Sequence, residues 1–248
     1  CIEIVFSEPM TTIGYDPTIT FTATPAGLYF AGGVWSTTTL TDDTYTATYT
    51  FSDATETVMG IDIDVNNAKD ANGNMQVPYS AADAFSVDTA NPEVMSVTPS
   101  DTMLTDGDTG LTLTVVYSEA MDTSGTNDPV LTFSTSPTGL AFVSGSWYDA
   151  VTYIASYTFT DMTETVMGID IDVNYAKDAN GNMQVTYSAA DVFSVDTANP
   201  TVASITVSDT MLTDADTTFC IEIVFSEPMT TIGYDPTITF TATPSGLY

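Results

Sequence analysis

The chain has 248 residues, of which 33 are acidic and only two are lysine or arginine, so its formal net charge is −31. It therefore lacks the basic face that nucleic-acid binding requires, and an anionic membrane surface would repel it. Histidine is absent, which removes Ser-His and Cys-His nucleophile pairs and histidine-ligated zinc sites. We expect a protein that is not an enzyme, and we expect no membrane insertion because no apolar run is long enough.

The residue composition predicts an all-β protein with packed cores. Hydrophobic residues make up 43% of the chain, aromatic residues make up 11%, and charged residues only 14%. Much of the polar remainder is threonine and serine, and the apolar part is rich in Val, Ile, Tyr and Phe, which favour strands. Acidity of this degree suits the binding of hard cations such as Ca²⁺.

Repeated segments divide the chain into three parts. SEPM at Ser7–Met10 recurs as SEAM at Ser118–Met121 and as SEPM at Ser226–Met229, and DTANP occurs at Asp88–Pro92 and Asp196–Pro200. The spacing predicts modules of about 110 residues. Residues 1–87 are predicted to form a module that lacks its first strand, residues 88–195 a complete module, and residues 196–248 the first part of the next. Because the text of Cys1–Thr24 returns as Cys220–Thr243, we expect the chain to be a segment of a longer array.

Alternation of apolar and polar residues predicts the strands. In the first module, Tyr45, Ala47, Tyr49 and Phe51 alternate with threonines, which indicates one buried and one solvated face. The complete module is predicted to contain seven strands, as in an immunoglobulin-like sandwich: Val94–Thr98, Leu111–Tyr117, Val130–Phe133, Leu140–Val143, Val151–Phe159, Val166–Val173 and Met183–Val195.

Three motifs of the complete module resemble those of a known family. They are DTANPEVMSVTPSD at Asp88–Asp101, VVYSEAMD at Val115–Asp122 and AKDANGN at Ala176–Asn182. Together they resemble the bacterial immunoglobulin-like (Big-type) tandem repeats of large surface and extracellular proteins. The resemblance covers the whole chain. It implies an extracellular β-sandwich array of the kind used in adhesins, surface layers and filaments, and it implies no enzyme.

Strands that run up and down place three oxygen-rich segments at the same end of the complete module. These are the DTANP linker, the loop after the second strand and the KDANGN loop before the last strand. Repulsion between converging carboxylates would be offset by Ca²⁺, which takes six to eight oxygen ligands. The candidate ligands in this and the equivalent positions are Asp88, Asn91, Glu119, Asp122, Asp172, Asp178, Asn180, Asn182, Asp196, Asn199, Glu227, Asp64, Asp70, Asn72 and Asn74.

Simpler interpretations of these residues stay open. DANGN contains Asn-Gly, a strong signal for a tight turn, and it lacks the distal Glu of an EF-hand loop. The linker DTANP is also compatible with a plain connection that ends in proline. Asp64 and Asp172 fit the solvated face of a strand. Calcium at the module junctions is therefore a hypothesis beside that of ordinary turns.

The two cysteines, Cys1 and Cys220, occupy the same position in two copies of the repeat. In its predicted strand Cys220 shares a face with Glu222, away from the core. An outward thiol could form a cross-link to a neighbouring chain; the alternative is a tolerated small residue.

The sequence favours a structural role over the other classes. We expect the repeat array of an extracellular filament, stalk or cell-surface protein, whose modules are spacers that associate with copies of the chain or with surface neighbours. The alternatives are the spacer region of an adhesin and, more weakly, carbohydrate binding through Tyr15, Tyr29, Trp35 and Tyr148. A neighbouring chain could also donate the strand that the first module lacks, for which Val202–Val207 is the equivalent segment.

Overall fold

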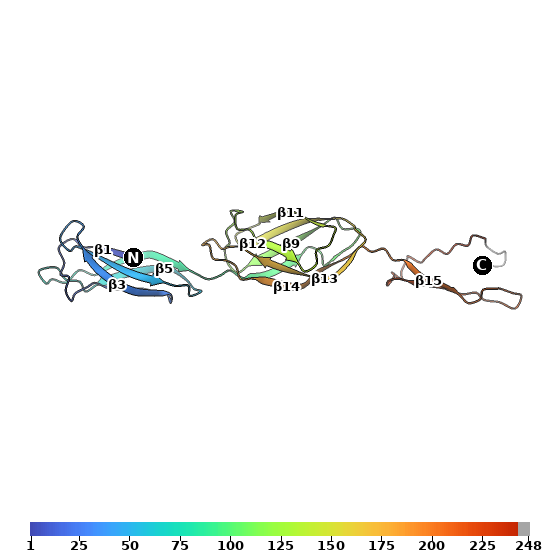
Figure 1. The fold of residues 1–248 in the computed structure, drawn as a ribbon, viewed down its shortest axis with the longest axis horizontal. Coiled ribbons are helices and arrows are strands. Elements are labelled where there is room, and N and C mark those ends of the chain that lie inside the picture. The colour runs from blue at the N-terminus through green and yellow to red at the C-terminus, as the bar shows by residue number, and fades with distance from the viewer. Residues whose placement is uncertain (243–248) are drawn as a thin grey trace.

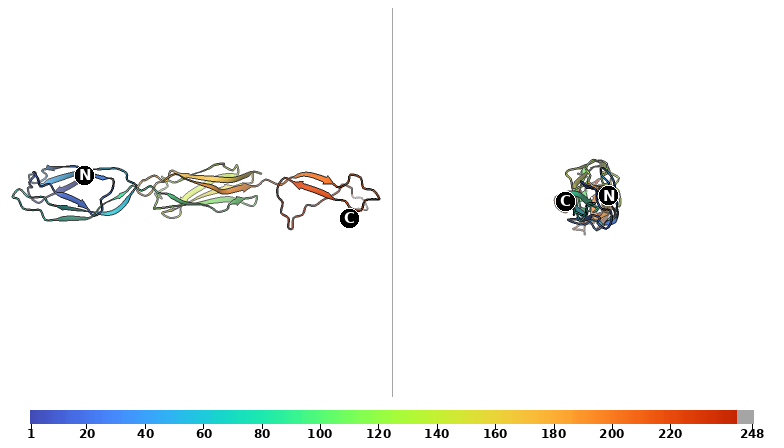
Figure 2. Two further views of the ribbon diagram at one scale, coloured as in Figure 1. Left: turned by 90° about the horizontal axis from the view of Figure 1, so that it is seen from below. Right: turned by 90° about the vertical axis from the view of Figure 1, so that its left-hand side faces the viewer.

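The computed structural model describes residues 1–242, and this part of the chain is built of β-strands without a helix. Three units follow one another along the long axis of the molecule (Figures 1 and 2). The sheets of the first two units pair into two β-sandwiches, and the third unit is a hairpin with extended loops. The all-β prediction is confirmed for the described residues. The predicted third module runs on to residue 248, so its last six residues lie outside them.

The first unit, here called the N-terminal sandwich, consists of two three-stranded sheets. Their strand orders are β1-β4-β3 and β2-β5-β6. Tyr45, Ala47, Ile61 and Val65 fill its core and are at most 3% exposed. The alternation in Thr44–Phe51 predicts the burial of Tyr45 and Ala47, whereas Phe51 is 51% exposed and Thr44 is buried, contrary to the prediction. The strands are β1 (Ile2–Val5), β2 (Thr18–Phe21), β3 (Leu28–Ser36), β4 (Thr44–Phe51), β5 (Thr57–Asn66) and β6 (Tyr79–Asp88).

The second unit, here called the central sandwich, has two four-stranded sheets with the orders β11-β12-β9-β7 and β10-β13-β14-β8. Each sheet thus has one strand more than its counterpart in the N-terminal sandwich. The strands are β7 (Val94–Pro99), β8 (Met103–Leu104), β9 (Gly110–Tyr117), β10 (Val130–Phe133), β11 (Leu140–Trp147), β12 (Thr152–Phe159), β13 (Thr165–Asn174) and β14 (Tyr187–Asp196).

Most strands predicted for the central sandwich are present, with three differences. β8 was not predicted; it pairs in parallel with β14 through Ser194 and Val195. β11 continues to Trp147 across a bulge between Phe142 and Ser144, and bulges of this kind interrupt the regular alternation. The last strand begins at Tyr187 rather than Met183, because Met183 pairs only with Lys177 to close a loop.

The two sheets of the central sandwich enclose a single hydrophobic core. Leu111, Leu113 and Val115 project from β9 and are at most 1% exposed, opposite Ile171 and Phe193 of the other sheet. Apolar residues alternate with threonines in β9, and successive side chains of a strand point to opposite faces. The alternation therefore explains why these three side chains all point into the core. Phe133 meets Tyr157 and Phe193 edge to face, with ring centroids 5.5 and 5.7 Å apart, an arrangement that aromatic quadrupoles favour.

The third unit contains the antiparallel pair β15 (Val202–Val207) and β16 (Ile221–Phe225). Every residue of β15 is exposed, and Val202, Ile205 and Leu212 are 51%, 62% and 43% exposed. The equivalent strands of the central sandwich are built into its two sheets, where β7 pairs with β9 and β8 pairs with β14. The third unit therefore presents apolar residues that have nothing to pack against among the described residues.

Candidate metal centre

The linker and two loops meet at the end of the central sandwich that faces the N-terminal sandwich. The amide of Ala179 donates to the carbonyl of Ala120 at 3.1 Å, and that of Asp122 donates to the carbonyl of Lys177 at 2.9 Å. These bonds hold the loop after β9 against the loop that precedes β14. The predicted meeting of the two loops at one end of the sandwich is thus present in the structure.

The loop Asp178–Asn182 is a tight turn organised by its first residue. The amide of Gly181 donates to the Asp178 carbonyl at 3.2 Å, and Gly181 has a φ of 98°, which glycine adopts without strain. The Asp178 Oδ1 accepts the amides of Asn180 and Asn182 at 2.9 and 2.8 Å. The interpretation of DANGN as a turn is therefore confirmed, and the same turn buries the Asp178 carboxylate to 1% exposure.

A buried glutamine, Gln184, connects this turn to the two sheets. The Nε2 of Gln184 donates to the Val173 carbonyl at 2.9 Å, and its Oε1 accepts the Tyr117 hydroxyl at 3.0 Å. Gln184 is 5% exposed, and a buried amide with satisfied partners fixes the backbone around it. The loop that carries Asp178 is thereby attached to both sheets of the sandwich.

Asp88, at the end of β6, connects the two sandwiches. Its Oδ1 accepts the Thr57 hydroxyl of the N-terminal sandwich at 2.8 Å. Its Oδ2 accepts the side-chain amide of Asn180, and its carbonyl accepts that of Asn182 at 3.3 Å. The linker is therefore bonded to both neighbours rather than free between them.

Three carboxylates converge at this point: Asp88, Glu119 and Asp178 each offer an oxygen, and these oxygens lie within 4.8 Å of one another. Asp88 and Asp178 have hydrogen-bond donors, but no described residue donates to the Glu119 carboxylate. Burial, followed by the charges of Asp88 and Asp178, raises the pKa of Glu119. The electrostatic field of the cluster thus disfavours a third negative charge. A partly buried, all-oxygen cluster of this kind could hold a metal ion.

The other acidic ligand candidates of the central sandwich, Asp122 and Asp172, lie outside this cluster. Asp122 accepts the Asn127 side-chain amide at 2.6 Å and the Ser124 amide at 3.0 Å, and these bonds lower the pKa of Asp122. Asp172 is exposed on β13, and Asn91 is exposed in the linker. Asn180 and Asn182 line the cluster as donors of hydrogen bonds to its acids.

Each flanking unit carries residues at positions equivalent to part of the Asp88–Glu119–Asp178 cluster. In the N-terminal sandwich, Asp70 accepts the amides of Asn72 and Asn74 at 2.9 and 2.7 Å, as Asp178 does in its own turn. Glu8 occupies the position of Glu119 there, and Asp64 is half-buried on β5.

At the end of β14, where the linker to the third unit begins, Asp196 accepts the Thr165 hydroxyl at 2.9 Å, as Asp88 accepts that of Thr57. Glu227 is half-buried and Asn199 is exposed. Within the described residues, only the central sandwich assembles all three carboxylates.

The hydroxyls of Thr57 and Thr165 were not anticipated from the sequence. Each binds the aspartate that starts a linker, and the shared TVMGIDIDVN text that begins with them was the available signal. The carboxylate oxygens of Glu56 accept the amides of Ala26 and Gly27 within the N-terminal sandwich, at 3.1 and 3.3 Å.

Both cysteines are exposed and neither forms a disulfide within the chain; the alternation predicted the outward face for Cys220. The Cys1 Sγ lies 3.8 Å from the Thr48 hydroxyl oxygen. An intermolecular cross-link through Cys220 stays a prediction, and gels run with and without reductant would reveal it.

Comparison with known proteins leaves the family open: no family model, no curated protein and no solved structure matches this chain. No helix among residues 1–242 has the length and hydropathy required to cross a membrane.

Proposed function

We propose that the chain is part of the structural repeat array of an extracellular filament, stalk or cell-surface protein. The observation that carries this proposal is the junction at Asp88, where one linker residue is hydrogen-bonded to the N-terminal sandwich through Thr57 and to the central sandwich through Asn180. A junction bonded on both sides restricts bending, which is what a spacer requires. The end-to-end order of the units in Figure 2 is consistent with such a role.

The immunoglobulin-like assignment and the Big-type resemblance form part of the proposal. Two antiparallel sheets packed face to face are the architecture that this resemblance implies. Under the same proposal the modules are residues 1–87, 88–195 and 196–248, they act outside the cell, and they have no catalytic activity.

Calcium is the cation that we propose for the Asp88–Glu119–Asp178 cluster. Carboxylate and amide oxygens are the ligands that Ca²⁺ takes in flexible geometry. Rotation of the Asn180 amide by a half-turn would replace its Nδ2 donor with the Oδ1 acceptor at nearly the same place. The cluster would then offer the Asp88 carboxylate from the end of β6, together with two carboxylates and an amide oxygen from the central sandwich, so that the bound cation would stiffen the junction.

Calorimetric calcium titration of the full chain, with Glu119→Gln and Glu8→Gln as a matched pair of variants, tests the metal. The expected Kd lies in the range of about 10⁻⁴ to 10⁻³ M that is typical of extracellular modules. Glu119→Gln should weaken binding at least tenfold. Glu8→Gln should leave it unchanged, because Glu8 lies outside the assembled cluster.

Small-angle X-ray scattering of the same samples tests the spacer role. We expect an extended particle in EDTA whose maximum dimension becomes better defined with calcium. A broad, compact ensemble in both conditions would refute a rigid spacer. An absence of calcium binding would refute the metal but not the array.

The spacer of an adhesin is the second candidate, and the junction supports it equally well because a stiff stalk serves both roles. Carbohydrate binding rests on exposed aromatic rings, of which Tyr148 is 77% and Tyr29 60% exposed. Trp35, by contrast, packs against Phe6 in a tilted arrangement and against Tyr45 edge to face, with centroids 5.6 and 5.1 Å away. Binding of the full chain on a glycan array would favour that weaker candidate.

A further inference from the structure

Each sandwich has an apolar groove along one side, between edge strands of its two sheets. In the central sandwich this groove lies between β10 and β11 and has a volume of about 670 Å³. In the N-terminal sandwich it lies between β2 and β3 and has a volume of about 490 Å³. The central sandwich has the groove although its two sheets carry the additional strands β7 and β8, so the groove is a feature of the repeat itself.

Both borders of each groove are strand edges without a partner. Within residues 1–242, β11 pairs only with β12 and β10 pairs only with β13. The same holds in the N-terminal sandwich, where β3 pairs only with β4 and β2 pairs only with β5. The outer backbone groups of these strands therefore face no other strand of the described chain, and such an edge is a template for a further strand.

An exposed phenylalanine borders both grooves at the same position of the repeat. Phe142 of β11 is 60% exposed, and Phe30 of β3 is 58% exposed. Phe142 meets Tyr157 edge to face, with ring centroids 5.5 Å apart. Phe30 meets Tyr49 in the same way at 5.4 Å. Each ring thus packs on one side only, and a partner that covers the groove would remove the rest of the ring from water.

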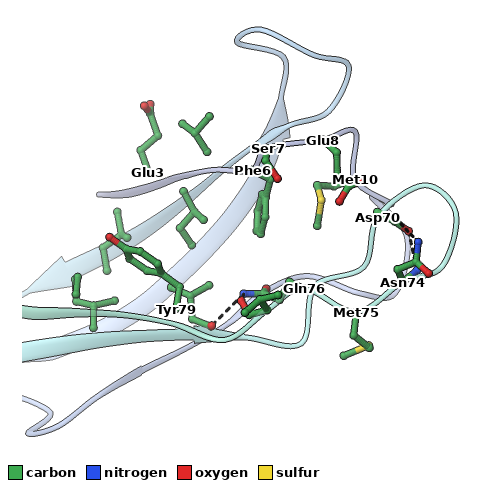
Figure 3. Close-up of a pocket in the computed structure, with 17 residues that line it drawn as sticks. Glu3, Phe6, Ser7, Glu8, Met10, Asp70, Asn74, Met75, Gln76 and Tyr79 are labelled. Carbon is green, nitrogen blue, oxygen red and sulfur yellow. Dashed lines mark hydrogen bonds between the residues drawn. The ribbon is translucent and has the colours of Figure 1, made fainter.

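Neither groove has a charged residue in its lining, although the chain contains 33 acidic residues. The bordering strands β3 (LYFAGGVWS) and β11 (LAFVSGSW) are also free of Asp, Glu, Lys and Arg. The hollow beside β1 differs, because the carboxylates of Glu3, Glu8 and Asp70 lie in its lining (Figure 3). Proteins commonly protect exposed strand edges with charges or proline, so these two uncharged edges are suited to a contact.

We propose that β11 pairs antiparallel with β11 of a second copy of the chain, and that β3 pairs in the same way with β3 of another copy. The charge pattern indicates this occupant. Two chains that each carry a net charge of −31 repel one another, and they approach most easily where both surfaces are uncharged. A cationic partner would find no carboxylate in either groove. A second copy also brings an unpaired edge of its own, so that pairing satisfies backbone groups of both chains.

The backbone of β11 gives the register of this contact. The Thr160 amide donates to the Gly139 carbonyl at 3.0 Å, so the Gly139 carbonyl faces β12. Because backbone groups alternate in direction along a strand, the Leu140 carbonyl and the Phe142 amide face away from β12. A twofold axis at Ala141 then places Phe142 opposite Leu140 of the other copy, and each Phe142 amide can donate to that carbonyl. The bulge that follows Phe142 limits the pairing to this short stretch.

The two uncharged edges lie on opposite sides of the chain. In Figure 1, β11 lies along the upper side of the central sandwich and β3 along the lower side of the N-terminal sandwich. Each contact is isologous, since the same strand of both copies takes part. A chain that pairs through both edges therefore acquires a neighbour on either side, and repetition builds a layer rather than a closed dimer. This inference rests on the proposed structural array and names the surfaces through which it would associate.

Sedimentation velocity of the full chain in EDTA, at 0.15 M and 0.5 M NaCl, tests the contact independently of calcium. Because salt screens the repulsion between acidic chains, we expect assemblies that grow with concentration and are larger at the higher salt. Phe142→Glu and Phe30→Glu each place a charge at one edge and should stop growth at pairs, and the double variant should be monomeric. Met167→Glu is the matched control, because it adds the same charge at a side chain that is 62% exposed on the inner strand β13, and it should assemble like the wild type.

Two outcomes of this experiment would overturn the proposal. One is a wild-type chain that stays monomeric in both salts. The other is a Met167→Glu chain that is impaired as much as Phe142→Glu. Circular dichroism would show that the variants retain their strands. A rigid monomer in the scattering experiment would leave the spacer role standing even if the edges do not pair, so the two proposals fail separately.

Hydrogen exchange measured by mass spectrometry provides a second test, which locates the contact. Peptides that cover β3 and β11 should exchange more slowly as the full chain assembles. The protection at β11 should be lost in Phe142→Glu and kept in Met167→Glu. Assembly without protection of these two strands would refute edge pairing. Protection of β11 in a monomeric chain on addition of a neutral glycan would assign the groove to a carbohydrate instead, and would likewise refute the proposal.

Discussion

Replacing Glu119 with glutamine should change the stability of the central sandwich in opposite directions with and without calcium. The carboxylate oxygens of Asp88, Glu119 and Asp178 lie within 4.8 Å of one another. Two unit charges about 5 Å apart repel by roughly 1 kcal/mol in water and roughly 3 kcal/mol at an effective dielectric constant of about 20. Because Glu119 is only partly buried, solvent screening leaves a relief of about 1 kcal/mol. In EDTA the variant should therefore melt about 4 °C higher.

Calcium reverses the sign of this effect. At a concentration one hundred times its Kd, a ligand that binds only the folded state adds about 2.7 kcal/mol, and the variant forfeits most of this gain. Scanning calorimetry of the full chain in EDTA and in calcium measures both differences, with Glu8→Gln as the control that should show neither. A Glu119→Gln chain that is destabilised in EDTA would show that the three charges do not repel, and the argument for a cation would fail.

The pH dependence supplies a check on the same variant. The folded state raises the pKa of Glu119 above its ordinary value of 4.5, so ionisation of this group costs stability above that pH. The advantage of the variant in EDTA should accordingly be present near pH 7 and fade as the pH falls to 4.5 and below.

Three further changes test the fold around the cluster by thermal or urea unfolding. Phe193→Ala should cost about 3–5 kcal/mol, because the ring is 1% exposed and leaves a cavity, whereas Phe142→Ala, at a ring that is 60% exposed, should cost much less; equal losses would contradict the core. Gly139→Ala should cost about 1–3 kcal/mol by overpacking, because its added methyl group would collide with the Thr160 carbonyl, and Gly107→Ala, where there is space, is its control. Asp122→Asn should lower the stability of the chain at pH 7, because hydrogen bonds to the ionised carboxylate lower the pKa of Asp122 below its usual 3.8. The stability difference between variant and wild type should vanish as the pH falls below 3.8. A difference that does not change with pH would refute this role of the Asp122 charge.

The fold was predictable where a strand is long enough to show its period. Leu111, Leu113 and Val115 alternate with polar residues and are buried as expected. β8 was missed because two residues have no period, and its place depends on the packing of Leu104 between the sheets. The start of β14 was also misplaced, because the loop before it is held by the side chain of Gln184 rather than by any local pattern.

The candidate site was predictable as a region but not as a set of ligands. Repeats and strand direction placed the right loops together, since those features are encoded along the chain. Which oxygens converge depends on how each side chain is held in the folded module: Asp122 is bonded to Asn127 outside the cluster, whereas Asp88 joins the cluster although Thr57 donates to it. Glu119 remains without a donor among the described residues, and that outcome is decided by tertiary geometry alone.

The parallel pairing of β8 with β14 has a consequence for a chain under tension. β8 lies near the point where the chain enters the central sandwich, and β14 is the strand by which it leaves. A pull on the two ends drags these neighbours in opposite directions along their length. Their hydrogen bonds, and those of β7 with β9, are then loaded in shear and must fail together rather than open one at a time. The geometry thus favours a link that resists sudden stretching over one that unravels gradually.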